Sequence, residues 1–353
     1  MKKIILINII VLYFLLSVII IFSPILIDFK KKIITASFND NRFELPNYEN
    51  INWAKKHFFE FRKLTTKYYD HITWRRNDFN GETVTIKKGY RMNNTEENFT
   101  LNKDIWVFGG STIWGTGADD KNTIPSLIEK LTNISTLNLG ETGYNTTQEL
   151  NLLLKELVKH KPKKIIFYDG VNDVGKCKKN LNYFSTIQES IIQTELQSKS
   201  SESYSKKLII APLKILEKLK EFFPKNQNAK STYNCDINFS KAEKIAKTFV
   251  NNWINVELIA KKNNIKFIPI LQPTIFTSSS NKDYLPTNYE LKKQYEILYK
   301  LIKIELSNVD FKYLNLESSL NKSENYFIDS FHLSPNGNMK IAREIITSNF
   351  FLD

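Results

Sequence analysis

The sequence predicts an α/β protein, a three-layer α/β/α sandwich with a mainly parallel sheet, preceded by one transmembrane helix at the amino terminus. Beyond residue 104, short apolar runs typical of buried strands alternate with longer segments whose apolar residues recur at helical spacing. That order is typical of a parallel sheet with helices on both faces. The membrane helix is predicted from an uncharged run at residues 4–27. The chain has 353 residues, 42% of them hydrophobic, which suffices for one large domain or two ordinary ones.

The first 32 residues give the clearest local signal. The uncharged run lies between lysines at 2–3 and at 30–32. As a helix it rises about 36 Å, compared with about 30 Å for the hydrocarbon core of a bilayer, so it can span with some tilt. We predict an uncleaved single-pass anchor at 1–32, because no convincing small-residue cleavage site follows; a cleaved signal peptide is the alternative. Lysines flank both ends and barely decide the orientation, but no later segment could return the chain, so we expect the body to be exported, periplasmic or extracellular.

The charge and the metal-binding residue types restrict the partners. The net charge of +13 is compatible with anionic lipid or an acidic polymer. We expect no nucleic-acid partner, because the sequence has no helix-turn-helix, zinc-finger or RNA-binding signature. Four histidines and two cysteines form no cluster with zinc spacing, and we expect no cofactor. Cys177 and Cys235 bracket one segment and fit a disulfide in an exported domain; two unpaired thiols are the alternative.

Two segments stand apart from the alternating pattern. Residues 33–103 are polar and aromatic, and we expect a tether plus an extension with short strands or hairpins that packs on the main domain. Residues 176–235 interrupt the alternation and are rich in lysine. We expect a surface insertion, with an amphipathic helix at 206–223 packed on the body. The alternative is a basic helix that lies on the membrane or covers the site.

The main domain is predicted element by element. A helix at 123–131 begins at Thr123, with Pro125 tolerated in its first turn. The last helix begins at Ser334, with Pro335 in its first turn. The strands are expected at 104–109, 134–140, 163–170, 265–273 and 311–316, and a further helix near 288–306.

Two more helices are predicted from capping boxes. Thr146 and Glu149 form the first, and Ser240 and Glu243 the second. The apolar face of the first helix is expected to contain Leu150, Leu153, Leu154, Leu157 and Val158, and that of the second Ile245, Phe249, Trp253 and Val256.

Candidate functional residues follow the strands, where ligands bind in such sheets. After the first strand come Gly109, Gly110 and Ser111. The glycines permit a tight turn that leaves the Ser111 hydroxyl near backbone N–H groups, which can hold developing negative charge. A phosphate-binding turn is disfavoured, because the GKS/T ending and the G-x-G-x-x-G spacing are both lacking.

Other strand ends carry groups that complete such a site. Gly143 and Asn172 follow the second and third strands and offer two further hydrogen-bond donors, although each taken singly reads as a turn or a loop cap. Asp329 lies three residues before His332, a spacing that lets the carboxylate accept from Nδ1–H while Nε2 takes a proton from a serine. With Ser111, these residues fill the roles of a Ser-His-Asp triad.

Four stretches together resemble a known family. FGGST, NLGETGYNTTQE, GVND and DSFH are similar, in order, to the four blocks of the SGNH hydrolase superfamily, also called GDSL-type esterases. The resemblance covers about 104–353, with 176–235 as its least matched part, and implies an SGNH/flavodoxin-like sandwich. Carried over by position, Ser111 is the nucleophile, His332 the general base and Asp329 the group that orients it. Ser111, Gly143 and Asn172 then form the oxyanion hole.

One residue departs from the family pattern. Gly110 stands before the serine where many members have aspartate. Together with the anchor and the extension, GGST looks like the membrane-attached bacterial branch, several of whose members act on cell-surface polysaccharides. We therefore expect an exported, membrane-anchored serine esterase that cleaves acyl esters, in particular O-acetyl groups on surface glycan. The alternatives are an O-acyltransferase for a surface polysaccharide and a catalytically inactive glycan-binding module.

Overall fold

The computed structural model describes residues 7–8, 11–12, 40–94, 98–184, 186, 189–190, 192, 232–320 and 324–352. The chain divides into two units, and the first comprises Met1–Asn41 and Gln193–Ala229. Its described residues are few, with 7–8 and 11–12 helical. Most of the predicted anchor and all of the predicted helix at 206–223 therefore lie outside the described residues. Within the described part of the chain, no helix has the length and apolarity needed to span a membrane.

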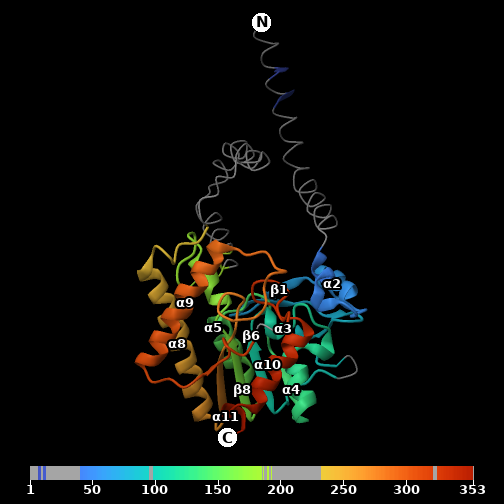
Figure 1. Ribbon diagram of the computed structural model, residues 1–353, viewed down its shortest axis with the longest axis vertical. Coiled ribbons are helices and arrows are strands. Elements are labelled where there is room, and N and C mark those ends of the chain that lie inside the picture. Colours follow the sequence, from blue (N-terminus) through green and yellow to red (C-terminus); the bar gives the residue numbers. More distant parts are fainter. Residues whose placement is uncertain are drawn as a thin grey trace. The chain divides into compact units, whose positions relative to one another are not determined.

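The second unit, Arg42–Ile192 with Lys230–Asp353, is built on one sheet of five parallel strands (Figure 1). Their order across the sheet is β10-β9-β8-β6-β7. All five predicted strands are present, although the last is only two residues long. The bounds are Ile105–Gly109 (β6), Thr136–Asn138 (β7), Lys164–Asp169 (β8), Lys266–Leu271 (β9) and Leu314–Asn315 (β10).

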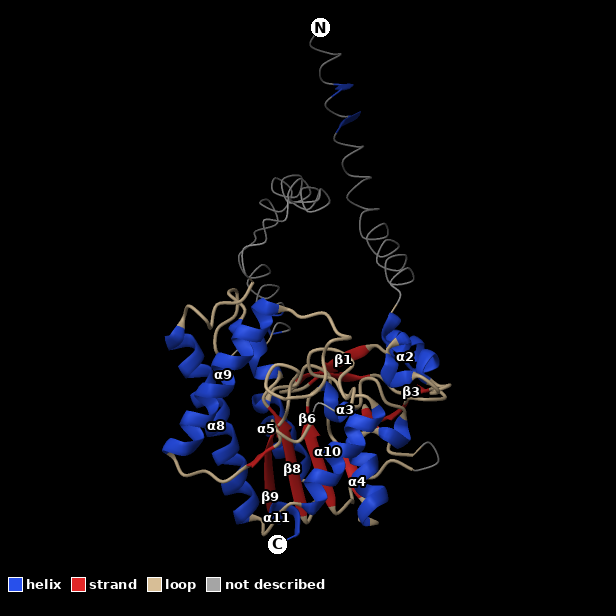
Figure 2. Ribbon diagram, viewed as in Figure 1, coloured by secondary structure: helices blue, strands red, loops and turns tan. Residues whose placement is uncertain are grey.

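Alternation along the strands explains their continuous apolar sequence. Trp106 and Phe108 of β6 join one buried cluster, whereas Ile105 and Val107 join another on the opposite face. Helices α5, α8 and α9 cover the first face, and α4 and α10 cover the second (Figure 2). The three-layer arrangement is therefore confirmed. The helix bounds are Ser111–Trp114 (α3), Ile124–Thr132 (α4), Thr146–Leu157 (α5), Phe239–Lys262 (α8), Tyr289–Asn308 (α9), Pro335–Thr347 (α10) and Asn349–Leu352 (α11).

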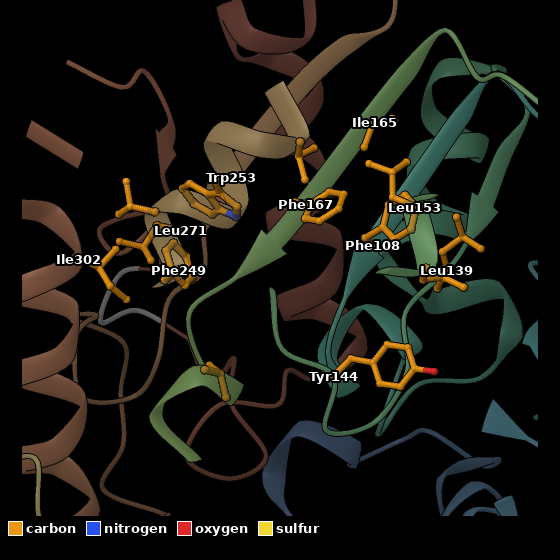
Figure 3. Close-up of a cluster of buried hydrophobic side chains, with 14 of the residues drawn as sticks. Phe108, Leu139, Tyr144, Leu153, Ile165, Phe167, Phe249, Trp253, Leu271 and Ile302 are labelled. Carbon is orange, nitrogen blue, oxygen red and sulfur yellow. The ribbon is translucent and has the colours of Figure 1, made fainter. Parts of the chain in front are cut away.

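The starts of α4, α8 and α10 can be compared with the capping residues that the sequence predicts. Thr123 caps α4 by accepting from the N–H of Ser126, and Ser334 caps α10 by accepting from the N–H of Gly337, as predicted. Helix α8 begins earlier than predicted, because the side chain of Asn238 accepts from Lys241 and no Ser240–Glu243 box forms. Its predicted apolar face is nevertheless confirmed: Ile245, Phe249, Trp253 and Val256 are all buried. Figure 3 shows Phe249 and Trp253 on the same side of the sheet as Phe108 and Phe167.

The start of α5 is also shifted. Asn145 is the cap and forms a capping box with Gln148, so the predicted Thr146–Glu149 box is wrong by one residue. An asparagine oxygen caps as well as a threonine hydroxyl, and Asn145 lies one position closer to the turn.

The buried face of α5 differs from the predicted apolar face. Leu153 is buried, but Leu154 and Val158 are 48% and 85% exposed. Two carboxylic acids, Glu149 and Glu156, take buried positions instead. Glu156 accepts a hydrogen bond of 2.7 Å from the Tyr90 hydroxyl, so partners distant in sequence allow polar residues to face inward.

The extension contains the predicted short antiparallel strands and an unpredicted helix, α2. The described part begins at residue 40, so most of the predicted tether lies outside it. The elements are η1 (Asn41–Glu44), η2 (Pro46–Tyr48), α2 (Ala54–Lys63), β1 (Thr66–Tyr69), β2 (Thr73–Arg76), β3 (Phe79–Asn80), β4 (Thr85–Lys87) and β5 (Tyr90–Arg91).

Buried polar contacts join the extension to the segment that follows α3. Arg91 donates to the carbonyls of Gly115 at 2.8 Å and Ala118 at 2.7 Å, and pairs with Asp120 at 3.0 Å. His57 of α2 accepts from the N–H of Gly117 at 3.0 Å. These contacts make the extension an integral part of the domain, because each satisfies a buried polar group of its neighbour.

A disulfide joins the two ends of the predicted insertion. Cys177, at the end of η4 (Asn172–Cys177), is bonded to Cys235. An isolated antiparallel bridge between Lys178 and Tyr233 continues the pairing. Of the predicted insertion at 176–235, residues 193–231 lie outside the described residues.

Candidate active site

A short turn at the end of β6 presents Ser111. The strand ends at Gly109, Gly110 is the cap of α3, and Ser111 is the first helical residue. The first N–H groups of a helix have no partner within it. The N–H of Ser111, the first residue of α3, is one of these groups, and the residue is 8% exposed.

The structure brings three predicted residues into one hydrogen-bonded row. Oγ of Ser111 lies 2.6 Å from Nε2 of His332. Nδ1 of the same imidazole lies 2.6 Å from Oδ2 of Asp329. Oδ1 of Asp329 accepts from the backbone N–H groups of Phe331 at 3.1 Å and His332 at 2.9 Å.

The charge of Asp329 determines the direction of these bonds. Burial raises the pKa of Asp329. The charge of His332, the hydrogen bonds from its ring and backbone, and the charge of Arg42 lower this pKa by more than burial raises it, so it lies below the ordinary value of an aspartate. An ionised carboxylate only accepts, so Nδ1–H is the donor. When the ring carries its single proton on Nδ1, Nε2 accepts a hydrogen bond from the Ser111 hydroxyl, which is the arrangement that activates a serine for attack.

The other two predicted residues lie beside the serine turn. The Nδ2 amide of Asn172 donates to the carbonyl of Tyr144 at 2.6 Å. Gly143 directly precedes Tyr144 and is exposed, with φ of +81°. An amide nitrogen carries two protons, so one N–H of Asn172 remains for a ligand.

The close approach of Asn172 explains the glycine before the serine. A Cβ at position 110 would lie 2.1 Å from Nδ2 of Asn172, well inside contact distance. The backbone of Gly110 itself is ordinary, with φ of −77°. A side chain at this position would therefore displace the Asn172 amide, whereas the backbone of the turn does not itself call for glycine.

The extension supports the loop that carries Gly143, which the sequence did not indicate. Trp74 donates from Nε1 to the carbonyl of Thr142 at 3.3 Å, and its ring meets that of Tyr144 edge-on, with centroids 5.3 Å apart. Arg76 forms a buried ion pair with Glu141 at 3.2 Å and donates to the hydroxyl of Thr142 at 2.6 Å. No motif marks Trp74 or Arg76, because their partners lie more than sixty residues away.

A buried acidic cluster underlies the Asn172 loop. Asp173 pairs with Lys176 at 2.7 Å and accepts from the hydroxyl of Thr146 at 3.2 Å. Glu149 and Asp169 are buried next to each other, and Asp169 also accepts from Trp253 at 2.8 Å. Burial and the charge of Asp169 raise the pKa of Glu149 well above its ordinary value.

The described residues show no group of three or more histidine, cysteine, aspartate or glutamate side chains that could hold a metal ion. The site offers a hydroxyl nucleophile, an imidazole base, an ionised carboxylate and adjacent N–H donors. Such a set suits attack on an acyl carbonyl.

Comparison with known proteins agrees with this chemistry. Residues 105–345 match the family model described as GDSL-like Lipase/Acylhydrolase. No curated protein matches the chain.

Similar solved structures include a putative lipolytic protein of the G-D-S-L family from Desulfitobacterium hafniense, with 12% identity, 69% of this chain and 98% of that chain covered, and a TM-score of 0.39. Another is a carbohydrate acetylesterase family member from Sinorhizobium meliloti (14% identity, 71% and 100% covered, TM-score 0.36). A third is a catalytic mutant of an acetylxylan esterase from Geobacillus stearothermophilus (12% identity, 71% and 95% covered, TM-score 0.37).

Replacing Gly110 by alanine tests the role of the Asn172 amide. The added methyl group displaces Nδ2, and we expect the rate at which a fluorophosphonate probe labels Ser111 to fall by about 10²-fold, the usual effect of losing one oxyanion donor. Gly175→Ala is the matched control, because a Cβ at 175 meets nothing within 4 Å. Equal labelling rates in the wild type and Gly110→Ala would show that Asn172 does not act on the site.

Replacing Glu149 by glutamine tests the buried acidic cluster. A raised carboxyl pKa makes the folded state lose stability as pH rises from about 4 towards that pKa. Glutamine keeps the donor but cannot ionise, so we expect Glu149→Gln to gain about 1 kcal/mol at pH 8, roughly 2–4 °C in melting temperature, and less at pH 5. Thermal melts at both pH values measure this, with the exposed Glu243→Gln as control. A gain that is the same at pH 5 and pH 8 contradicts the assignment.

Proposed function

The chain belongs to the GDSL-like lipase/acylhydrolase family, and on this basis we propose that it is an exported, membrane-anchored serine esterase that removes O-acetyl groups from cell-surface glycan. Family membership makes the protein an acyl-ester hydrolase of the SGNH superfamily. The membrane anchor, the exported location and the glycan target are the proposed parts.

The observation that carries the catalytic assignment is the 2.6 Å contact between Oγ of Ser111 and Nε2 of His332. In the proposed reaction, Oγ attacks the acyl carbonyl and its proton passes to Nε2. Asp329 then stabilises the imidazolium through Nδ1–H. The oxyanion is held by the N–H groups of Ser111 and Gly143 and by the Asn172 amide.

The second half of the reaction reverses these proton movements. The imidazolium gives its proton to the leaving alcohol, and the acyl group remains on Ser111. Water, deprotonated by His332, attacks the acyl-enzyme and releases the acid. If a sugar hydroxyl replaced this water, the same residues would perform O-acyl transfer.

A polar pocket supports a hydroxylated substrate. An open pocket of about 480 Å³ is lined by Asn47, Asn281, Glu324, Asn325, Ser334 and Asn336, among others. Amide side chains donate and accept at once, which suits sugar hydroxyl groups. The triad residues do not line this pocket; its Ser334 follows His332 by two residues along the chain.

The sequence and the cross-link support anchoring and export. The run at 4–27 is uncharged and long enough to span a bilayer. The disulfide between Cys177 and Cys235 suits an oxidising compartment outside the cytosol. We place the anchor at 1–32, a tether and the extension at 33–103, and the hydrolase domain at 104–353.

Replacing Ser111 by alanine tests the activity. We expect turnover of 4-nitrophenyl acetate and of an O-acetylated oligosaccharide to fall by about 10⁴- to 10⁶-fold, with the melting temperature little changed. The exposed Ser240→Ala is the matched control. Hydrolysis that persists in Ser111→Ala would refute the nucleophile. Acyl transfer to added glycan in excess of hydrolysis by the wild type would favour the transferase.

Expression of the full-length chain tests the anchor. We expect the protein to stay in the membrane fraction after alkaline extraction, and the purified chain to retain its amino-terminal peptide, because an uncleaved apolar helix is not removed by high pH. Release into the supernatant, or a chain that begins after residue 32, would contradict an uncleaved anchor.

A further inference from the structure

Arg42, from the extension, touches the carboxylate of the triad. Its Nη1 lies 3.0 Å from Oδ2 of Asp329, the oxygen that also accepts from Nδ1 of His332 at 2.6 Å. The two residues are 287 positions apart in the chain. Both side chains are largely shielded, with 24% and 32% of their surfaces exposed, so water weakens this ion pair less than one at the surface.

The arginine is held in place by a small core of its own. Its guanidinium group lies over the ring of Phe58 of α2, 4.9 Å from the centroid. Phe58 packs in a buried cluster with Tyr48, Ala54 and Ile328. Ile328 directly precedes Asp329, so the segment that orients Arg42 and the loop that carries the carboxylate share one apolar contact.

With Arg42 included, each oxygen of the Asp329 carboxylate accepts two hydrogen bonds. Oδ1 accepts two backbone N–H groups, and Oδ2 accepts the imidazole and the guanidinium. A carboxylate offers about four acceptor positions, so these four bonds fix the plane of the group as well as its location. The backbone N–H groups that bind the carboxylate come from its own loop. Arg42, in contrast, binds the carboxylate from another part of the domain.

We propose that Arg42 is a positioning residue for ester hydrolysis: it holds the Asp329 carboxylate in the orientation that aligns His332 on Ser111. This inference rests on the proposed function of the triad. It makes the amino-terminal extension a working part of the catalytic unit.

Side chains from other elements face the pair of Asp329 and His332. Ser111, Tyr295 and Arg42 approach it from α3, α9 and η1. Burial raises the pKa of Tyr295 well above its ordinary value, so this phenol stays neutral. Of these neighbours, Arg42 is the one whose positive charge pairs with the Asp329 carboxylate.

The test compares Arg42→Met, Arg42→Lys and Lys56→Gln in the full-length protein. Lys56→Gln removes one positive charge from the same extension, at an exposed pair with Glu82. For Arg42→Met we expect kcat/KM for 4-nitrophenyl acetate to fall by about 10- to 100-fold on the pH plateau, because the carboxylate is less well aligned.

Arg42→Lys keeps an N–H donor and the charge without the planar fork, so we expect its kcat/KM to lie between those of Arg42→Met and the wild type. Lys56→Gln should match the wild type. Wild-type kcat/KM in Arg42→Met would overturn the proposal.

A second measurement separates this proposal from the function itself. The chain has four histidines, so the downfield Nδ1 proton of His332 can be followed in a ¹⁵N-histidine spectrum without any turnover. We expect this signal to shift or broaden in Arg42→Met and to persist in Lys56→Gln, with melting temperatures confirming that each variant is folded. If the wild type neither hydrolyses esters nor reacts with a fluorophosphonate, the proposed function fails, while an unchanged Nδ1 signal in folded Arg42→Met removes the role of Arg42.

Discussion

The contact between Nε2 of His332 and Oγ of Ser111 joins parts of the chain 221 residues apart, and the arrangement of the domain serves this contact. Ser111 stands at the carboxyl end of a central strand because β6 pairs in parallel with β7 and β8. His332 reaches it from the loop before α10, a helix that packs on the same face of the sheet as α4. The parallel order of the strands places all their carboxyl ends at one edge, so residues from distant segments meet there.

The extension performs several tasks at that edge. Arg91 and His57 satisfy the backbone of the segment after α3, and Trp74 and Arg76 hold the loop that carries Gly143. Each contact is polar and buried, so it specifies one geometry at a cost that only complete pairing offsets. The domain that positions the reacting groups therefore begins near residue 42, well before the first strand of the parallel sheet.

The sequence predicted the elements whose signals are local. Strand runs buried on both faces, the caps at Thr123 and Ser334, and the triad spacing all depend on residues close together in the chain, and all appear in the structure. Helix α2 was missed because it buries His57 and Glu60 through distant hydrogen bonds, which obscures its apolar period. The face of α5 was misread for the same reason, since Glu149 and Glu156 occupy inward positions.

Contacts between residues distant in the sequence cannot be predicted from single segments. Arg42 has no motif around it, and its contact with Asp329 emerges only when the two ends of the domain come together. Gly110 is the reverse case. The sequence shows it as a departure from the family pattern, but the close approach of the Asn172 amide to this position is visible only in the structure.

The bond between Cys177 and Cys235 has a consequence for how this domain can vary. It closes a ring at the end of η4, the turn that begins with Asn172, and residues 193–231 lie within that ring. The bond therefore keeps the end of η4 next to the segment that leads into α8, and this distance does not depend on how many residues the chain carries between the two cysteines.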